Sequence, residues 1–385
     1  MPNGTHRHEV AVVGAGQAGL AMGYFLRQQA RDFVILERAD HLAPQWRGRW
    51  DSLKLFTSRR YDSLPGLPFP GDPDGYPGRD EVVAYLDSYA QTFGLPIRLG
   101  SDIRSLRREG DVFALQTGSG DVLADQVVVA TGPFQEPRVP AFAEALSDDV
   151  VQFHSTRYRS PSDLPAGRTL VVGGGNTGYQ IAEELTRSRE VHLAVGGRQG
   201  PLPQRLLGRD LFWWLTKTGL IDKTVDTKVG RRLKDRDALV GSNPRKAKRQ
   251  GITLRPRVTG TSGRGVNFSD GSTIEVDGVV WATGFTSDYS WIDPPVTDDG
   301  GGVIHRRGVT DLPGLYMLGM QWQYTRGSAL LGWVQDDAQF IAQRIAERAV
   351  SATRRRTTNG TSPAATQPLT AGQGDRDATR RTRNF

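Results

Sequence analysis

Glu9-Val-Ala-Val-Val13 runs directly into Gly14-Ala-Gly16-Gln-Ala-Gly19, and later in the chain Thr169-Leu-Val-Val172 runs into Gly173-Gly-Gly175-Asn-Thr-Gly178. Each stretch is an apolar strand followed by a glycine-rich turn and residues that suit a helix. A dinucleotide needs this arrangement, because the first glycine makes the turn, the second admits the pyrophosphate and the third lets the helix pack on the strand. One such loop is a weak signal, but two in the same context predict two dinucleotide-binding folds.

The strand that follows each glycine loop indicates which dinucleotide is bound. In the first fold Phe33-Val-Ile-Leu-Glu37 ends in a carboxylate that can accept hydrogen bonds from a ribose hydroxyl. In the second fold Val191-His-Leu-Ala-Val195 is followed by Gly196-Gly-Arg198, and a guanidinium there suits a 2′-phosphate, which an acid would repel. A surface arginine without a ligand is the alternative interpretation of Arg198. The pair of strands predicts FAD on the first fold and NADPH on the second.

Two Ala-Thr-Gly turns support this fold assignment. Asp125-Gln-Val-Val-Val-Ala-Thr-Gly132 and Asp277-Gly-Val-Val-Trp-Ala-Thr-Gly284 are short apolar runs that end in a turn, which is typical of buried parallel strands. We therefore predict an α/β protein with two Rossmann-like dinucleotide-binding domains. The FAD domain is expected to be discontinuous, with the NADPH domain inserted into it.

The expected domain boundaries follow from the motifs. The FAD domain is predicted to comprise residues 1–160 and 285–350, and the NADPH domain residues 161–284 with a helical excursion over 199–251. Residues 351–385 are rich in Arg, Thr and Gly and contain almost no large apolar side chain. Such a segment cannot bury enough surface to offset its ordering entropy, so we expect a disordered, arginine-rich tail.

Two stretches of the excursion are open to more than one interpretation. One apolar stripe at helical spacing is formed by Leu206, Leu207, Leu211, Trp214 and Leu215. This stripe, which includes the Trp213-Trp214 pair, predicts a helix that packs on its domain, forms a lid or tunnel wall over a lipophilic substrate, or lies on a membrane surface. Lys228–Arg249 is basic but interleaved with acidic and apolar residues, so we interpret it as a solvated helix face.

The chain resembles the flavin-containing monooxygenases, the class B flavoprotein monooxygenases with two dinucleotide-binding domains. The resemblance covers roughly residues 8 to 348 and looks closest to short bacterial flavoproteins and to YUCCA-like enzymes. Besides both fingerprints and both Ala-Thr-Gly turns, it rests on Trp46-Arg47 before Leu53-Lys-Leu55, on Leu64–Pro70, on Pro313–Gly319 and on Gln323–Gly332.

The sequence also departs from the family pattern. The identifying motif Phe-x-Gly-x-x-x-His-x-x-x-aromatic survives only as His154-Ser-Thr-Arg-Tyr158, with Asp148 and Val150 where Phe and Gly are expected. The missing glycine and the short chain favour N- or S-oxygenation over Baeyer–Villiger oxidation. The active-site Asn of the family, expected near Thr57-Ser58, is absent.

The resemblance implies a reaction carried by the cofactors. NADPH reduces the flavin, the reduced flavin takes up O₂ at C4a, and the resulting (hydro)peroxyflavin transfers one oxygen atom to a small lipophilic substrate. The alternatives are Baeyer–Villiger oxidation, YUCCA-like oxidative decarboxylation, an NADPH-dependent flavin reductase or oxidase that oxygenates nothing, and a nucleotide-binding sensor without turnover.

The candidate site residues form three groups. The residues expected to hold FAD are Gly14, Gly16, Gly19, Glu37, Trp46 and Arg47. The residues expected to hold NADPH are Gly173, Gly175, Asn176, Thr177, Gly178 and Arg198. The residues expected beside the flavin ring, as catalytic candidates, are Thr57, Ser58, Gln321, Trp322 and Arg326.

The composition argues against several other classes of protein. The chain of 385 residues has no cysteine, which excludes a redox-active disulfide and thiolate metal sites, and its six histidines are too scattered for a metal motif. The net charge of +7 comes mostly from seven arginines in the tail, so we expect no nucleic-acid partner. No apolar run is long enough to span a membrane. We therefore expect a cytoplasmic enzyme without a metal, for which a homodimer is possible.

Overall fold

The first fingerprint follows the central strand of a parallel sheet. In this computed structural model, which describes residues 7–118, 120–197, 200–234 and 238–359, that strand is β1 (Arg7–Val13). It pairs in parallel with β2 (Phe33–Leu36) and β6 (Val122–Val129). β3 (Ile97–Arg98) extends the sheet beyond β2, and β24 (Leu315–Met317) extends it beyond β6. Every residue of β2 is buried, as expected for a strand that is covered on both faces.

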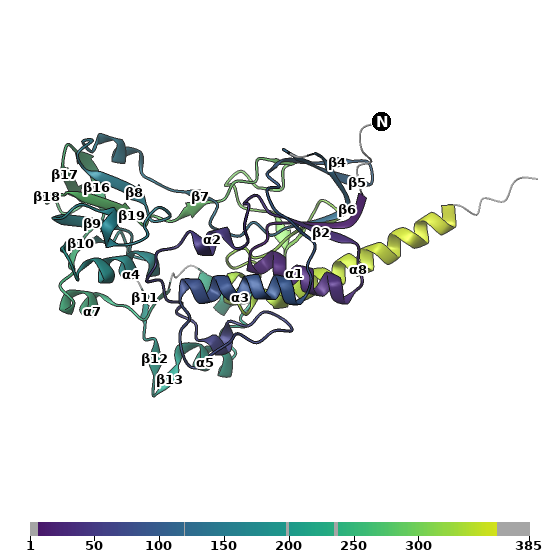
Figure 1. Ribbon diagram of the computed structural model, residues 1–385, viewed down its shortest axis with the longest axis horizontal. Coiled ribbons are helices and arrows are strands. Elements are labelled where there is room, and N and C mark those ends of the chain that lie inside the picture. The colour runs from purple at the N-terminus through teal and green to yellow at the C-terminus, as the bar shows by residue number, and fades with distance from the viewer. Residues whose placement is uncertain (1–6, 119, 198–199, 235–237, 360–385) are drawn as a thin grey trace, which may run out of the picture. The chain divides into compact units, whose positions relative to one another are not determined.

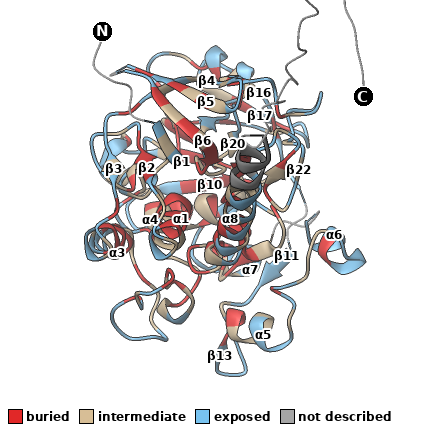
Figure 2. Ribbon diagram, turned by 90° about the vertical axis from the view of Figure 1, so that its right-hand side faces the viewer, coloured by how far each residue is buried: buried red, intermediate tan, exposed pale blue. Residues whose placement is uncertain are grey.

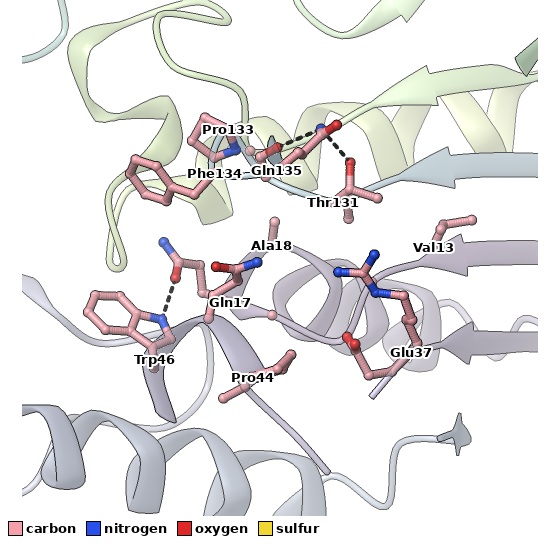
Figure 3. Close-up of a pocket in the computed structure, with 18 of the residues that line it drawn as sticks. Val13, Gln17, Ala18, Glu37, Pro44, Trp46, Thr131, Pro133, Phe134 and Gln135 are labelled. Atoms are coloured by element: carbon pink, nitrogen blue, oxygen red, sulfur yellow. Dashed lines mark hydrogen bonds between the residues drawn. The ribbon is translucent and has the colours of Figure 1, made fainter. Parts of the chain in front are cut away.

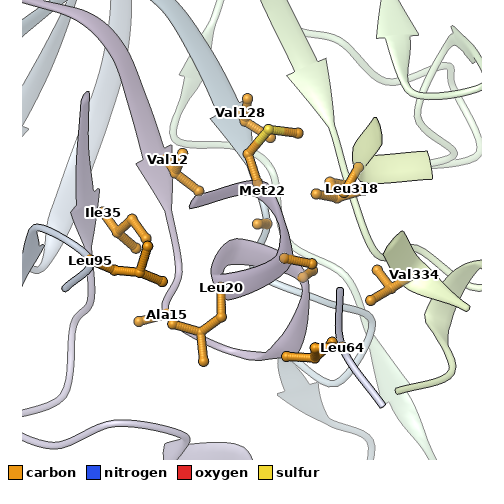
Figure 4. Packing of buried hydrophobic residues seen from close by; sticks show 14 of the residues in the cluster. Val12, Ala15, Leu20, Met22, Ile35, Leu64, Leu95, Val128, Leu318 and Val334 are labelled. Atoms are coloured by element: carbon orange, nitrogen blue, oxygen red, sulfur yellow. The ribbon is translucent and has the colours of Figure 1, made fainter. Parts of the chain in front are cut away.

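Helices cover one face of this sheet (Figure 1). An antiparallel hairpin continues the sheet beyond β6, and its apolar side chains pack with those on the other face of β1 and β2. The helices are α1 (Gln17–Gln28), α3 (Arg79–Thr92) and the first part of α8 (Val334–Asn359). Figure 4 shows their core, in which Val12 and Val128 of the sheet pack with Leu20, Met22 and Val334 of the helices. The hairpin strands are β4 (Ile103–Glu109) and β5 (Val112–Thr117), and the short strands β21 (Ile292–Asp293), β22 (His305–Arg306) and β23 (Val309–Thr310) complete the sheet.

The second fingerprint lies in a separate sheet of five parallel strands. Their order is β15 (Thr253–Arg255), β10 (Glu190–Ala194), β9 (Arg168–Val172), β19 (Gly278–Trp281) and β8 (Val151–His154). One face packs on α4 (Asn176–Leu185) and α7 (Pro244–Arg249), and the other on the small sheet of β16 (Val258–Ser262), β17 (Gly265–Phe268) and β18 (Thr273–Glu275). The prediction of two Rossmann-like folds is confirmed.

The boundary between the folds lies earlier than the expected position at residue 160. β8 already belongs to the second sheet, and η2 (Ala141–Ala145) packs on the same fold. The chain crosses between the folds at β7 (Glu136–Pro137) and returns at β20 (Phe285–Thr286), and these two strands pair with each other. The expected boundary was wrong because β8 is a short strand whose partner, β19, lies far along the sequence, so no local pattern marks it.

The predicted helix over residues 206–215 is only partly present. The chain first forms a β-hairpin, β12 (Arg205–Leu206) and β13 (Arg209–Asp210), and α5 (Leu211–Lys217) begins after it. Positive φ angles of 50° at Leu207 and 77° at Gly208 make the turn, and Leu207 is 83% exposed. The stripe was misleading because Gly208 lies within it and supplies a turn that helical spacing ignores.

The basic stretch of the excursion is likewise not one helix. It contains α6 (Lys228–Lys234), which is largely exposed (Figure 2), then β14 (Ala238–Val240) and α7. Leu239 and Val240 are buried, and β14 pairs with β11 (Gly200–Leu202). The expectation of a solvated helix face is therefore correct for α6 and wrong for β14.

At the end of the chain α8 continues to Asn359, past the expected domain end at residue 350. Residues 351–359 extend the helix instead of beginning the disordered tail, and the segment contains Ala352 and three arginines, which are good helix formers. Residues up to Ile345 form one compact unit, and Ala346 begins a second. The expectation of disorder over residues 360–385 lies outside the described residues. None of the described helices is both long and apolar enough to cross a membrane.

Candidate functional site

The glycines of the first fingerprint differ in what surrounds them. Gly14 has φ of 105°, and a Cβ on it would lie 2.7 Å from the Ala130 carbonyl oxygen, so this position requires glycine. A Cβ on Gly19 would lie 1.8 Å from the Gly14 oxygen, which explains how closely α1 approaches β1. By contrast, no atom of the described residues lies within 4 Å of a Cβ placed on Gly16. The space beside Gly16 therefore suits a pyrophosphate approached by backbone N–H groups.

The second fingerprint repeats this arrangement. Gly173 has φ of 131° and faces the Ala282 oxygen, at 2.0 Å from a Cβ placed on the glycine. A Cβ on Gly178 would lie 1.9 Å from the Gly173 oxygen, whereas one on Gly175 meets none of the described atoms within 4 Å. Both loops thus leave the same space open at the second glycine, which fits two dinucleotides.

A cavity of about 760 Å³ lies in front of the first loop. It runs from the end of β2, past Gly16, to the segment that covers the fold, and several of its side chains are drawn in Figure 3. Of the residues predicted for FAD and for the flavin ring, five line it: Gly14, Gly16, Glu37, Trp46 and Thr57. The fit of an open pyrophosphate cradle and a strand-end carboxylate in one cavity supports FAD as its ligand.

Glu37 lies at the end of β2, as predicted, and is 7% exposed. Its carboxylate accepts hydrogen bonds from the backbone N–H groups of Ala15, at 2.8 Å, and Ala39, at 3.0 Å. These bonds fix the side chain between the glycine loop and the strand end. Glu37 is thus held in the cavity, where the carboxylate can receive a ribose hydroxyl.

Trp46 and Arg47 have different environments. The Trp46 indole donates a hydrogen bond to Gln17 Oε1 at 2.8 Å, which ties α2 (Pro44–Arg47) to the glycine loop (Figure 3). Arg47 is not among the described residues that line the cavity. Its guanidinium pairs with Asp87 and bonds the Leu42 carbonyl oxygen. Trp46 therefore lines the cavity, whereas Arg47 is turned to a salt bridge outside its described lining.

Thr57 and Ser58 are both buried but differ in their surroundings. Thr57 lines the cavity and donates a hydrogen bond from Oγ1 to Asp62 Oδ1 at 2.5 Å. Ser58 does not line it, and its hydroxyl lacks a hydrogen-bond partner among the described residues. Asp62 was not predicted from the sequence, because it follows one short 3-10 turn, η1 (Arg59–Tyr61), in a long connection that has no periodic pattern.

The other three catalytic candidates lie close to the cavity in sequence but do not line it. From the chain around them the lining residues are Gly319, Ala329, Leu330 and Leu331, and Gln17 donates a hydrogen bond to the Ala329 oxygen at 3.1 Å. Arg326 begins η4 (Arg326–Ala329). Gln321, Trp322 and Arg326 are absent from the part of the lining that the structure describes.

In the second fold Asn176 holds a distant strand. Its Oδ1 accepts a hydrogen bond from the Val240 N–H at 3.0 Å, and its Nδ2 donates to the Ala238 oxygen at 3.4 Å. Thr177 follows it in the first turn of α4. Arg198 lies outside the described residues. Another arginine does reach the end of β10, because the Arg257 guanidinium donates to the Gly196 oxygen at 2.7 Å.

Arg49 also lines the cavity and was missed from the sequence. Its guanidinium lies 4.9 Å from the ring centre of Phe134 and 5.8 Å from that of Phe285. Burial, and to a lesser extent the charge of Arg159, lower the pKa of Arg49 to about 10. The His154 that remains from the family motif is buried, and its Nε2 lies 3.1 Å from the Gly284 oxygen.

Comparison with known proteins agrees with this geometry. A family model described as pyridine nucleotide-disulphide oxidoreductase matches residues 11–202. An uncharacterized CzcO-like oxidoreductase of Geobacillus kaustophilus is 47% identical over 343 residues, which cover 88% of this chain and 99% of that protein. The indole-3-pyruvate monooxygenase YUCCA1 of Oryza sativa is 30% identical over 359 residues, which cover 84% and 86% of the two chains. The chain belongs to the flavin-containing monooxygenase family.

A solved structure supports the same assignment. The flavin-containing monooxygenase from Stenotrophomonas maltophilia has a TM-score of 0.75 and 28% identity, covering 89% of this chain and 99% of that one. The predictions of a flavoprotein monooxygenase and of FAD and NADPH as its cofactors are confirmed. The absence of cysteine sets the chain apart from the disulfide chemistry named in the family description.

Proposed function

We propose that this monooxygenase uses NADPH and O₂ to oxygenate a small lipophilic substrate at nitrogen or sulfur. The proposal rests on the wall of the cavity at Phe56 and Thr57. FAD held by Gly14, Gly16 and Glu37 would supply the reduction by NADPH and the activation of O₂. The chain's own residues bind it, orient it and exclude water.

An aromatic cluster closes that wall. Phe56, which lines the cavity, stacks on Phe212 of α5 with ring centres 5.9 Å apart. Tyr61 stacks on Trp333 at 5.5 Å, and Phe212 lies 5.5 Å from the same Trp333. Thr57 is only 4% exposed beside this cluster. Exclusion of water favours oxygen transfer over the wasteful release of H₂O₂, which supports an oxygenase over an oxidase.

The cluster also bears on the role of the excursion. Of the three roles considered for the apolar stripe, packing on the domain and forming a tunnel wall are both supported, since Leu211 and Phe212 are buried against residues of the cavity wall. Trp214 donates to the Leu206 oxygen at 2.9 Å and thereby braces the hairpin onto α5. We infer that α5 forms part of the substrate-side wall.

The test is the coupling of NADPH oxidation to product formation. Amines, sulfides, oximes and ketones are screened by product mass, and oxygenated product and H₂O₂ are counted per NADPH. We expect N- or S-oxide, and a Phe212→Ala variant that releases several-fold more H₂O₂ than the wild type. Leu207→Ala, at the exposed hairpin turn, is the matched control. Lactone or ester products would indicate Baeyer–Villiger oxidation, and H₂O₂ alone would indicate an oxidase.

Coenzyme preference is a second part of the proposal. Arg198 follows β10 in the sequence, and the Arg257 guanidinium donates to the Gly196 oxygen just after the same strand, where an acid would repel a 2′-phosphate. We therefore propose that NADPH is preferred over NADH. A cytoplasmic location and a homodimeric state remain predictions.

A further inference from the structure

The connection that covers the first fold contains a buried carboxyl group with no obvious structural purpose. Asp62 is 0% exposed, and its Oδ2 has no hydrogen-bond partner among the described residues. Its Oδ1 accepts the hydrogen bond of Thr57, and Thr57 lines the cavity. Leaving a buried carboxyl oxygen unpaired is costly, so a residue that served stability alone would be apolar or fully bonded.

The charges around Asp62 do not neutralise it. The groups that face it are Arg59 of η1 (Arg59–Tyr61), Asp210 before α5, and Tyr85 of α3. Arg59 is paired with Glu81, Asp210 accepts from the Tyr76 hydroxyl at 2.6 Å, and Tyr85 donates to the Leu67 oxygen at 2.7 Å. Burial raises the pKa of Asp62 to about 7; the Thr57 hydrogen bond and Arg59 oppose the rise, and Asp210 adds to it. Both protonation states are therefore accessible near neutral pH.

The two protonation states give Thr57 opposite roles toward the cavity. When Asp62 is ionised, the Thr57 hydroxyl donates to Oδ1, and its oxygen can only accept a hydrogen bond from a ligand. When Asp62 is protonated, a proton on Oδ2 would be a buried donor without a partner, so Oδ1 is the better position. The acid then donates to Thr57, whose own proton is free to point into the cavity.

We propose that Thr57 and Asp62 form a proton switch on the cavity wall, in which the protonation of Asp62 decides whether Thr57 accepts or donates a hydrogen bond toward the bound flavin. The proposal rests on the flavin ring lying at this end of the cavity, as in the proposed function. A flavin ring suits such a switch, because its ring nitrogens change between acceptor and donor on reduction. When the switch passes a proton, the O–H bond of Asp62 breaks as Thr57 gives its own proton to the acceptor, and no electrons move.

The experiment follows the bound flavin and not turnover. The absorbance spectrum of oxidised FAD and its midpoint potential are recorded between about pH 5 and pH 9. In the wild type we expect the flavin absorbance and the midpoint potential, plotted against pH, to show an inflection near pH 7. We expect this inflection to be lost in Asp62→Asn and in Thr57→Val. Thr57→Ser, which keeps the hydroxyl, should restore it. Asp74→Asn, an exposed acid of the same connection, is the matched control and should leave it unchanged.

Each outcome separates the switch from the proposed function and from a structural role. An infrared band of a protonated buried carboxyl at acidic pH, lost in Asp62→Asn, would identify the titrating group directly. An inflection that persists in both variants, or that is absent from the wild type, overturns the switch while leaving the flavin assignment intact. Wild-type protein that purifies without flavin would instead count against the proposed function. If Thr57→Ser fails to restore the inflection while Thr57→Val and Thr57→Ser melt at the same temperature, the hydroxyl is not the link.

Discussion

The two dinucleotide folds of this chain share their backbone and differ in side chains. In each, the strand order places the fingerprint strand between the second strand and the Ala-Thr-Gly strand: β2-β1-β6 in the first fold and β10-β9-β19 in the second. The first and third glycines are sterically required in both, and the second faces open space in both. The glycine loops therefore leave room for a dinucleotide in both folds, and we propose that the residues at the end of the next strand select which one binds.

The residue after the second glycine extends the comparison. It is Gln17 in the first fold and Asn176 in the second, and each begins a helix. Gln17 holds Trp46 and the Ala329 oxygen, whereas Asn176 holds both ends of β14. The same position thus fastens a different segment to each glycine loop: α2 and the Ala329 segment in the first fold, and β14 in the second.

The largest expected effect comes from filling the open space of one loop at a time. In Gly16→Val the new side chain occupies the space that we assign to the pyrophosphate. We therefore expect purified protein without FAD and without yellow colour. Gly175→Val should remain yellow but should not bleach when NADPH is added anaerobically. The measurement is the visible spectrum before and after NADPH. A yellow Gly16→Val variant, or a colourless Gly175→Val variant, would break the assignment of the two folds.

The connection that covers the first fold also carries a buried acid, Asp62. Its pKa is raised from 3.8 to about 7, so between these values the native state binds more protons than the unfolded state. The free energy of unfolding of the wild type should therefore fall as pH rises from about 4, with the full penalty present above pH 7. Relative to wild type, Asp62→Asn should gain about 3 kcal/mol between pH 5 and pH 8. Denaturant titration of both proteins at each pH measures this, and a constant difference would contradict it.

The difference between the ends of β2 and β10 is tested by the preference for NADPH over NADH. Arg198→Ala should lower kcat/KM for NADPH by about 30- to 150-fold, the effect of losing a charge-assisted hydrogen bond of roughly 2 to 3 kcal/mol, and should hardly change that for NADH. We expect Arg257→Ala to act in the same direction. Arg205 bonds the Asp74 oxygen at 2.9 Å, so Arg205→Ala is the control and should leave the ratio unchanged. Equal losses with both coenzymes would make these arginines structural, and a wild type that prefers NADH would refute the 2′-phosphate argument.

The features of the two folds that depend on short, local sequence patterns could be predicted from the sequence. Both glycine loops and both Ala-Thr-Gly turns are short local patterns, and the two folds that they predict are confirmed. Glu37 lies at the strand end where the sequence places it, and its role toward FAD stays a prediction. The strand β8 pairs with the distant β19, and the environment of Asp62 includes the distant Tyr85 and Asp210, so no local periodicity marks either feature. The helix predicted over residues 206–215 was wrong at its start for another reason. The leucines there have helical spacing by chance, and we gave that spacing more weight than the turn signal of Gly208. Arg49 is indistinguishable in the sequence from the many surface arginines, and only its position in the cavity sets it apart.

The smallest expected effect comes from removing the hydrogen bonds by which Gln17 and Asn176 hold other segments to the glycine loops. Gln17→Ala removes two neutral hydrogen bonds, each worth about 1 kcal/mol, from the segments that close over FAD. We expect FAD to bind several-fold to about 30-fold more weakly, as measured by fluorescence during reconstitution of apoprotein, while KM for NADPH stays the same. Asn176→Ala removes the two bonds to β14 and should do the reverse, raising KM for NADPH with FAD affinity unchanged. This double dissociation is what separates local fastening from general loss of stability, because a destabilised protein would lose both cofactors together. If each variant weakens both cofactors equally, the two folds do not act as independent binding units, and the shared position after the second glycine serves the stability of the whole chain.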